Sequence, residues 1–278
     1  MIERKINQAI RLLQSYNRWK PLTLAYSGGK DSDTILHLCK LAHVPITAVH
    51  NCTTIDPPGT LRHCEQKNVI IQRPKYTFFQ LVEKKGLPSL TRRFCCEYLK
   101  EQYIADLLIL GVRKDESIKR NKRYTEPTAC RIYTKSKSTE QVMPILYWDL
   151  EDIKQFHDME NLHFHELYYD NNVLVPTRRL GCIGCPLQGD RGKKDFIEYP
   201  KFLRRLAISY SKYVSTHKCV EGVYEDILWN IMYSNHKDHN YQQTFHGLFA
   251  PPSAKEMLED IFHVELPNVN PPRKIAVQ

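Results

Sequence analysis

The hydrophobic residues in the first half of the chain alternate between a helical and a strand-like pattern. Ile6, Ile10 and Leu13 recur at helical spacing and predict an amphipathic helix over residues 2–16. Short apolar runs follow and predict strands at 22–26, 46–50, 69–71 and 107–110. Segments of helix length separate these runs. The pattern therefore predicts an α/β fold with a doubly wound parallel sheet, which binds ligands at the carboxyl ends of its strands.

The pattern changes near Pro176, where a loop rich in cysteine and glycine begins. Residues 193–233 then have a helical pattern that is rich in Lys, Arg and Tyr. We therefore expect two parts, a nucleotide-binding α/β domain at 1–175 and a helical, cysteine-containing region at 176–278. Within the latter, residues 267–278 are proline-rich and are expected to be extended or mobile.

Composition narrows the function classes. Lys and Arg exceed Asp and Glu by 40 to 31, and the net charge of +9 favours polyanionic partners such as nucleotides or nucleic acid. No apolar run reaches the roughly 18–20 residues that a membrane helix needs. Residues 1–5 do not resemble the start of a signal peptide, so we expect a cytoplasmic protein without membrane attachment. That compartment is reducing, so the nine cysteines cannot all be disulfides.

A turn with two glycines lies between the first predicted strand and a helix. Helix N-termini present free N–H groups and a partial positive charge, so Gly28 and Gly29 would let the backbone wrap closely around a phosphate. Lys30 adds a positive charge. The common P-loop motif does not fit, because Asp31 follows Lys30 and no glycine occupies position 24. We interpret the turn as a different phosphate-binding loop; the alternative is a glycine turn that binds nothing.

Four of the cysteines form two pairs. Cys95 and Cys96 are adjacent, and Cys182 and Cys185 form a C-x-x-C pair in a glycine-containing loop. Four thiolates suit either a tetrahedral zinc ion or an iron–sulfur cluster. Neighbouring side chains on a helix point about 100° apart, which is awkward for one zinc ion and easier for two irons of a cluster. The pattern favours the cluster over zinc and over unliganded or redox thiols. The other cysteines are expected to be small buried residues: Cys39, Cys52, Cys64, Cys130 and Cys219.

Residues 27–32, Ser-Gly-Gly-Lys-Asp-Ser, resemble the PP-loop signature of the ATP pyrophosphatase superfamily, which has the adenine nucleotide alpha hydrolase-like fold. Its members cleave ATP between the α and β phosphates and adenylylate a substrate. The resemblance implies that Ser27 and Ser32 hydrogen-bond the leaving pyrophosphate, that the glycines permit close approach and that Lys30 neutralises charge. It also implies that Asp31 caps the helix or helps to place Mg²⁺.

The two cysteine pairs behind such a loop resemble the phosphoadenosine phosphosulfate (PAPS) reductase family, in whose adenylyl-sulfate branch these four cysteines hold a [4Fe–4S] cluster. Residues 111–117, together with Arg120, and residues 144–153 resemble further segments of that family. The resemblance implies that Arg113 and Arg120 contact phosphate or sulfonate groups, with surface ion pairing as the alternative. His50 would lie near the adenine or ribose, or would be structural.

Two features differ from a sulfonucleotide reductase. Reductases of this family attack sulfur with a cysteine in a C-terminal Glu-Cys-Gly-Leu-His segment, and the surroundings of Cys219 do not match it. Their loops have also typically lost the Gly-Lys-Asp-Ser form that residues 29–32 keep. The combination resembles instead the sulfurtransferase branch of the family, which includes the DNA-phosphorothioation enzymes.

That branch implies an ATP-dependent sulfurtransferase-like enzyme that adenylylates an acceptor, with ATP and Mg²⁺ bound at the loop. Its iron–sulfur cluster would take part in sulfur chemistry, and a sulfur donor such as a cysteine desulfurase would be a partner. Two alternatives stay open. One is a PAPS or adenylyl-sulfate reductase, and the other is a non-catalytic nucleotide-binding subunit, with partner subunits, of a defence or mobile-element complex.

The basic helical region is a candidate contact for a nucleic-acid acceptor, because cations track a phosphate backbone and interleaved aromatic rings stack on bases. The alternative is a solvated helix face over an aromatic core. The cations are Lys193, Lys194, Lys201, Arg204, Arg205, Lys212 and Lys218, and the aromatic residues are Tyr199, Phe202, Tyr210 and Tyr213.

Overall fold

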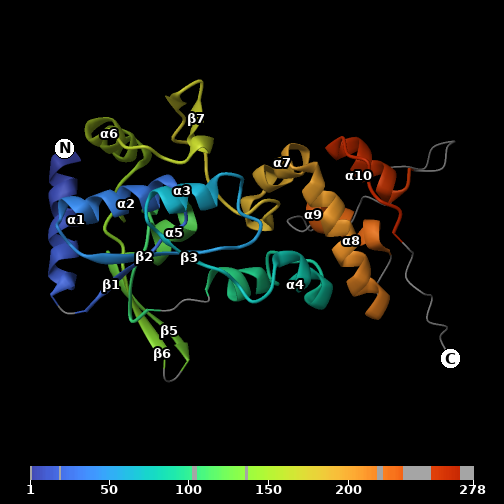
Figure 1. Cartoon of the computed structure of the whole chain (residues 1–278), viewed down its shortest axis with the longest axis horizontal. Helices are drawn as coiled ribbons and strands as arrows, with labels where there is room; N and C mark the ends of the chain where they lie inside the picture. The colour runs from blue at the N-terminus through green and yellow to red at the C-terminus, as the bar shows by residue number, and fades with distance from the viewer. Residues whose placement is uncertain are drawn as a thin grey trace. The chain divides into compact units, whose positions relative to one another are not determined.

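The computed structural model describes residues 2–18, 20–101, 105–134, 137–217, 222–233 and 252–269 (Figure 1). The chain forms two compact units. The first comprises Met1–Cys52, Asp56–Arg73 and Lys100–Leu180, and the second comprises Thr53–Ile55, Pro74–Leu99 and Gly181–Gln278. In the second half of the chain the units divide after Leu180. The second unit also includes two segments from the first half.

The first unit is built on a six-stranded sheet with strand order β3-β2-β1-β4-β6-β5. Neighbouring strands are parallel except β5 and β6, which form an antiparallel hairpin. The strands are β1 (Leu22–Ala25), β2 (Ile46–Asn51), β3 (Ile70–Gln72), β4 (Leu107–Ile109), β5 (Thr128–Thr134) and β6 (Lys137–Val142). The helices are α1 (Ile2–Asn17), α2 (Lys30–Leu41), α3 (Thr60–Gln66), α5 (Ile118–Arg123) and α6 (Leu150–Glu160).

Shorter elements complete this unit. Two 3₁₀ turns are η2 (Lys114–Glu116) and η3 (Glu166–Tyr168), and a small hairpin pairs β7 (Tyr169–Asp170) with β8 (Val173–Leu174). Among the described residues, no helix is both long enough and apolar enough to cross a membrane.

The predicted α/β fold with a largely parallel sheet is confirmed. The four apolar runs form β1 to β4, and the predicted first helix is α1. The sequence interpretation missed β5 and β6, which add an antiparallel edge to the sheet. Residues 137–142, Lys-Ser-Thr-Glu-Gln-Val, have too few apolar side chains to stand out as a strand. Their extended form depends on pairing with β4 on one side and with β5 on the other. A hydrophobicity pattern along the chain does not reveal such pairing.

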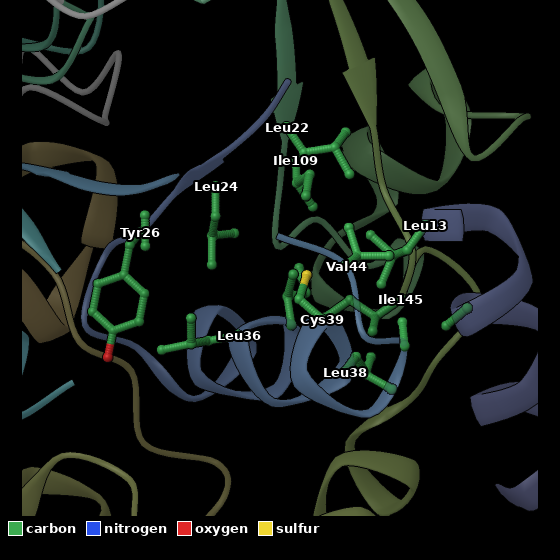
Figure 2. Close-up of a cluster of buried hydrophobic side chains, with 14 of the residues drawn as sticks. Leu13, Leu22, Leu24, Tyr26, Leu36, Leu38, Cys39, Val44, Ile109 and Ile145 are labelled. Carbon is green, nitrogen blue, oxygen red and sulfur yellow. The ribbon is translucent and has the colours of Figure 1, made fainter. Parts of the chain in front are cut away.

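The hydrophobic core of the first unit lies between the sheet and the helices α1, α2 and α6. Ile6, Ala9 and Leu13 form the buried stripe of α1, as its helical spacing predicts. Figure 2 shows part of this core, where side chains of α1, α2 and β1 gather around Cys39. Burial of each large aliphatic side chain contributes about 1.5–3 kcal/mol, so this core fixes the strand ends that carry the site.

The strand order places the glycine turn at a topological switch point. β1 pairs with β2 on one side and with β4 on the other. The strands β2 and β3 therefore extend the sheet from one side of β1, and β4 and the strands after it extend the sheet from the other side. In doubly wound sheets, ligands bind outside the carboxyl ends of the strands at such a point. The turn follows Ala25, the last residue of β1, and therefore lies where a ligand is expected.

The N-terminus of α6 gives a first testable prediction. The Asp149 carboxylate accepts from the backbone N–H of Asp152, which lowers the pKa of Asp149, and the Asp152 carboxylate accepts in return from the N–H of Asp149. Asp149→Ala is expected to lower the free energy of unfolding by about 1 kcal/mol. Asp149→Asn is the control, because an asparagine caps about as well. An equal loss in both variants, measured by denaturant unfolding at neutral pH, would contradict the capping role.

The second unit is helical. Its elements are α4 (Phe78–Lys85), the π-helical turn η1 (Cys96–Lys100), the 3₁₀ turn η4 (Pro186–Gln188), α7 (Asp190–Glu198), α8 (Pro200–Thr216), α9 (Val223–Tyr233) and α10 (Ala254–Phe262). α4 packs against α8, and Phe78 stacks on Phe202 with ring centroids 5.8 Å apart. The described residues of the predicted helical region 193–233 belong mainly to α7, α8 and α9, and Lys218 and Cys219 lie outside the described residues.

Candidate functional site

The glycine turn joins β1 to α2 through a backbone that only glycine adopts readily. Gly28 has φ +79°, and a Cβ at this position would lie 3.1 Å from Thr60 Cγ2 and 3.2 Å from Leu180 Cδ2. Gly29 is the N-cap of α2, and no side chain occupies the capping position. The first N–H groups of α2 are therefore presented at the turn, which is the arrangement that binds phosphates at helix N-termini.

Lys30 is a buried cation at the start of α2. Its side chain is 4% exposed; Nζ lies 3.5 Å from the Arg178 carbonyl oxygen and 3.6 Å from Asp31 Oδ2. The ammonium group also lies 5.3 Å from the centre of the Tyr168 ring. Burial lowers the pKa of Lys30, and the nearby Asp31 carboxylate only partly opposes this. Such a desolvated cation is stabilised when an anion binds beside it.

Asp31 holds Arg113 at the turn. The Arg113 Nε donates to Asp31 Oδ1 at 2.8 Å, and one of its Nη atoms lies 3.1 Å from Asp115 Oδ2. Gly111 makes this possible, because a Cβ there would lie 3.3 Å from Asp31 Cβ. The structure corrects one expectation: Asp31 does not cap α2, whose N-cap is Gly29. Both Asp31 oxygens face cations, so this carboxylate is not arranged as a ready ligand for Mg²⁺.

Arg120 belongs to the same cluster of charges. It lies on α5 and pairs with Glu116, four residues earlier. Burial lowers the pKa of Arg120, and the charges of Arg179 and Arg113 lower it further. The structure thus brings the predicted residues Lys30, Asp31, Arg113 and Arg120 together near the carboxyl ends of β1 and β4.

The two serines of the loop differ in their surroundings. Ser32 is buried, and its hydroxyl donates to the Gly29 carbonyl oxygen at 2.7 Å. Ser27 is exposed; its Oγ accepts from the Gly29 N–H at 3.3 Å and lies 3.3 Å from Ser32 Oγ. Ser32 shapes the turn in this state, whereas the Ser27 hydroxyl is accessible to a ligand. Pyrophosphate contacts of both serines remain predictions.

His50 is buried at the carboxyl end of β2. Its Nδ1 lies 3.1 Å from the Tyr26 carbonyl oxygen, and its Nε2 lies 3.6 Å from Asp56 Oδ2. Burial lowers the pKa of His50, but interactions with Asp56 and Cys64 outweigh it and raise the pKa to about 10. Because a carbonyl oxygen only accepts, the Nδ1 atom carries a proton and donates to Tyr26. These contacts favour the structural alternative, and a contact with the nucleotide remains a prediction.

Behind the loop lies a buried polar network that the sequence interpretation missed. The Tyr26 hydroxyl donates to Asp33 Oδ1, and His63 Nε2 lies 2.8 Å from Asp33 Oδ2. The ring of His165 packs edge-on against that of His63, with centroids 5.6 Å apart. Burial lowers the pKa of His165, and the charge of His63 adds to this effect. The network ties the start of α2 to β1 and α3. Asp33 follows the loop directly, and this position was the one feature of the sequence that could have indicated the network.

Tyr168 and residues 178–180 also contact the turn without having been predicted. The Leu180 N–H donates to the Tyr168 hydroxyl at 3.2 Å, and a Cβ at Gly29 would lie 3.2 Å from that hydroxyl. Burial raises the pKa of Tyr168 to about 12, so it remains a neutral hydroxyl. No local sequence pattern marks these residues, because they come from the far end of the first unit.

All four cysteines of the predicted cluster lie in the second unit. Cys182 and Cys185 are the first and last residues of a tight turn. In this turn, the Cys185 N–H donates to the Cys182 carbonyl oxygen at 3.3 Å. Cys96 begins the π-helical turn η1. Its hydrogen bond with Cys95 raises the pKa of Cys95; burial and the charges of Cys96, Cys185 and Cys182 raise it further. The four thiols are therefore electrostatic neighbours.

Four thiols in one unit are the type of donor set that an iron–sulfur cluster takes. Within the described ranges, however, no three His, Cys, Asp or Glu side chains are placed so that they could hold a metal ion. The cluster, and zinc as its alternative, therefore remain predictions.

The basic helices place their charged and aromatic residues on different sides. Lys201, Arg204 and Arg205 of α8 are exposed, whereas Phe202 and Tyr210 are buried in the core of the second unit. Phe202 and Tyr210 are thus not available to stack on bases, which agrees with the alternative of an aromatic core. The phosphate-tracking role of the exposed cations is still a prediction.

The conformation of Gly28 gives a second testable prediction. Gly28→Ala would place a non-glycine residue at φ +79°, which costs roughly 1–2 kcal/mol, and would press a methyl group against Thr60 and Leu180. We expect loss of ATP binding as well as of stability. Gly189→Ala is the control, because Gly189 also has positive φ but has nothing within 4 Å of its Cβ position. Equal ATP affinity in both variants, measured by calorimetry, would show that the turn does not hold the nucleotide.

The solved structures that are similar to this chain include the following three. FMN adenylyltransferase from Candida glabrata has 17% identity and a TM-score of 0.43, and the match covers 60% of this chain and 58% of that one. PAPS reductase from Candida auris, in a phosphate complex, has 16% identity and a TM-score of 0.45, covering 61% and 92%. The U34-tRNA thiolase NcsA from Methanococcus maripaludis, with its [4Fe–4S] cluster, has 14% identity and a TM-score of 0.41, covering 76% and 78%.

No curated protein matches the sequence significantly. The sequence model of the phosphoadenosine phosphosulfate reductase domain, in contrast, matches residues 21–188. This range includes the glycine turn, the segment of Arg113 and both cysteine pairs, and it covers more than half of the chain. The chain therefore belongs to the phosphoadenosine phosphosulfate reductase domain family.

Proposed function

We propose that this protein is an ATP-dependent sulfurtransferase-like enzyme that cleaves ATP between the α and β phosphates and adenylylates an acceptor. The observation that carries the proposal is the buried Lys30 ammonium group at a helix N-terminus, next to a glycine turn with Arg113 beside it. A buried cation, a helix N-terminus and a guanidinium together favour a polyphosphate over a neutral ligand. The intact Gly-Lys-Asp-Ser form of the loop supports ATP rather than a sulfonucleotide.

In the first step, an acceptor oxygen attacks the α-phosphorus of ATP. A bond forms between that oxygen and phosphorus, and the bond to the α,β-bridging oxygen breaks. Pyrophosphate leaves with the electron pair. Lys30 and Arg113 stabilise the charge that develops on this leaving group, and the N–H groups at the start of α2 orient it. Arg120 extends the positive charge on the α5 side.

In the second step, hydrosulfide from a sulfur donor attacks the activated centre of the acceptor. The bond from that centre to oxygen breaks, and AMP leaves with the electron pair, so the acceptor gains sulfur without a change of redox state. The candidate ligands of an iron–sulfur cluster are Cys95, Cys96, Cys182 and Cys185. When bound, such a cluster would bind sulfur or transfer electrons. A nucleic-acid acceptor would lie along the exposed cations of α8.

A PAPS or adenylyl-sulfate reductase is the second candidate, and membership of the PAPS reductase domain family favours it. The two functions give different products. The sulfurtransferase releases AMP and pyrophosphate from ATP, whereas a reductase releases sulfite from a sulfonucleotide when a thiol donor is present.

The experiment that tests the proposal compares these products directly. The anaerobically purified protein is incubated with ATP, sulfide and single-stranded DNA or tRNA, and in parallel with PAPS or adenylyl sulfate and a dithiol. We expect AMP and pyrophosphate in the first reaction. Sulfite in the second reaction and no AMP in the first would replace the proposal by the reductase. ATP binding without either product would indicate a non-catalytic subunit.

The lowered pKa of Lys30 predicts how binding depends on pH. Protonated Lys30 attracts phosphate and neutral Lys30 does not, so ATP affinity should fall as pH rises, and at lower pH than for a lysine with the ordinary value of 10.5. Above the pKa of Lys30 in the free protein, bound phosphate favours the protonated form, so binding in that pH range should take up a proton. Lys30→Arg is the control, because arginine stays protonated and should flatten the profile. Identical calorimetric pH profiles for the two proteins would contradict this assignment.

A further inference from the structure

Glu116 connects three arginines beside the glycine turn. Its Oε2 accepts from the backbone N–H of Arg113 at 3.2 Å and pairs with the guanidinium of Arg120. Its carbonyl oxygen accepts from an Nη atom of Arg179 at 3.0 Å. One residue at the end of η2 therefore fixes a backbone and two side chains that come from separate parts of the first unit. Arg179 belongs to neither the loop nor the segment of Arg113.

Residues 178–180 lie directly on the turn, which explains how Arg179 comes to this place. Lys30 Nζ lies 3.5 Å from the Arg178 carbonyl oxygen. The side chain of Leu180 lies so close to Gly28 that a Cβ there would be 3.2 Å from it. Contacts on either side thus hold the Arg179 backbone over the turn. The Arg179 side chain is itself exposed and can reach a ligand.

The cations of this cluster interact unfavourably with one another. Burial is the largest cause of the lowered pKa of Lys30 and of Arg120. The positive charges of Arg179 and Arg113 lower both pKa values further. Like charges held together cost free energy, and an anion that binds among them offsets this cost. The carboxylates of Asp31, Asp115 and Glu116 compensate only in part, because these three negative charges face four positive charges. The cations are Lys30, Arg113, Arg120 and Arg179.

We propose that Arg179 is a third arginine that contacts the polyphosphate of the bound nucleotide, and that Glu116 is the positioning residue that holds it near Arg113 and Arg120. The proposal rests on the proposed function of the glycine turn as a nucleotide site. The ligand is the pyrophosphate part of a nucleoside triphosphate, because a fork of guanidinium groups binds several phosphate oxygens at once. A nucleoside monophosphate lacks this part and should not need Arg179.

The test measures binding of ATP, inorganic pyrophosphate and AMP by calorimetry to the full chain and its variants. Arg179→Ala is expected to weaken ATP and pyrophosphate binding by about 10- to 100-fold, while AMP binding changes less than about twofold. Arg179→Lys should recover only part of the loss, because an ammonium group cannot bind two oxygens in parallel. The dependence of ATP binding on salt should also become weaker in Arg179→Ala, since one phosphate contact is lost.

Arg123→Ala is the matched control. Arg123 is an exposed arginine on α5, and its guanidinium lies over the Tyr124 ring, 5.4 Å from the centroid. This variant removes the same charge and should bind all three ligands as the unchanged protein does. Glu116→Gln keeps the backbone carbonyl oxygen that accepts from Arg179 and removes the side-chain charge that pairs with Arg120. It therefore tests whether the Glu116 side chain, through Arg120 and the Arg113 N–H, sets the position of that carbonyl oxygen. If it does, Glu116→Gln should weaken pyrophosphate binding less when Arg179→Ala is already present. Additive losses in the double variant would overturn this role of Glu116.

The results separate the two proposals. If Arg179→Ala weakens ATP, pyrophosphate and AMP equally, or no more than Arg123→Ala does, Arg179 does not contact the polyphosphate. The same conclusion follows if the unchanged protein binds no polyphosphate. If the selective loss is found but ATP never yields AMP, the arginine proposal stands and the proposed enzymatic function fails. Unchanged melting temperatures of the variants exclude misfolding as the cause of a loss.

Discussion

Replacing Lys30 by alanine is expected to lower the rate of AMP and pyrophosphate formation from ATP by about 10²- to 10³-fold. The reason is the position of this ammonium group, which is buried at the glycine turn where the leaving pyrophosphate would gain charge. The rate is measured as release of pyrophosphate in the presence of an acceptor and sulfide.

The matched control for this variant lies on the same helix. Lys40 is exposed in the last turn of α2, so Lys40→Ala removes the same charge from the same element at the opposite end. We expect its rate to equal that of the unchanged protein. Equal rates for Lys30→Ala and Lys40→Ala would show that the turn is not the site of ATP cleavage.

Replacing Cys182 by alanine is expected to reduce the iron content from about four atoms per chain to less than about one. Cys182 is buried, and its thiol is one of the three whose charges raise the pKa of Cys95. Removal of one of four thiolates leaves an incomplete ligand set that loses its cluster to chelators and oxygen. Iron, zinc and acid-labile sulfide are measured after anaerobic purification, together with the absorbance spectrum.

Cys130→Ala is the control for general effects of removing a thiol. Cys130 is an exposed residue of β5 in the first unit, so the expectation that it is buried was wrong, whereas Cys39, Cys52 and Cys64 are buried as expected. Replacement of Cys130 should leave the iron content unchanged. A colourless unchanged protein that contains one zinc ion would contradict the cluster and support the zinc alternative. Iron that persists in Cys182→Ala would show that other groups hold it.

The parts of the fold that the sequence predicted are those whose signals are local. The apolar run that forms β1 lies between polar segments, and the stripe of Ile6, Ala9 and Leu13 repeats within a single helix. β5 and β6 were not predicted, because the side chains of β6 are mostly polar and the order of both strands comes from pairing at the sheet edge. Hydrophobic patterning predicts buried elements better than edge strands.

The candidate site follows the same rule. Lys30 and Asp31 were found because one short segment contains the whole turn, and Arg113 because it stands in a recognisable motif. Arg179 and Tyr168 were not found, because they reach the turn through tertiary packing; the contact of Lys30 with Arg178 joins residues 148 positions apart. The capping role of Asp31 was wrong because the helix begins at Lys30, which leaves Gly29 as the N-cap.

The buried network behind the loop has a consequence for how this sequence can vary. Tyr26, Asp33 and His63 satisfy one another's hydrogen bonds where water cannot replace a lost partner. An apolar replacement of Asp33 alone would leave the Tyr26 hydroxyl and the His63 imidazole buried without this hydrogen-bond partner. An apolar replacement of all three residues would leave no such unpaired group. In related sequences, we therefore expect the residues at these three positions to be either all retained or all replaced.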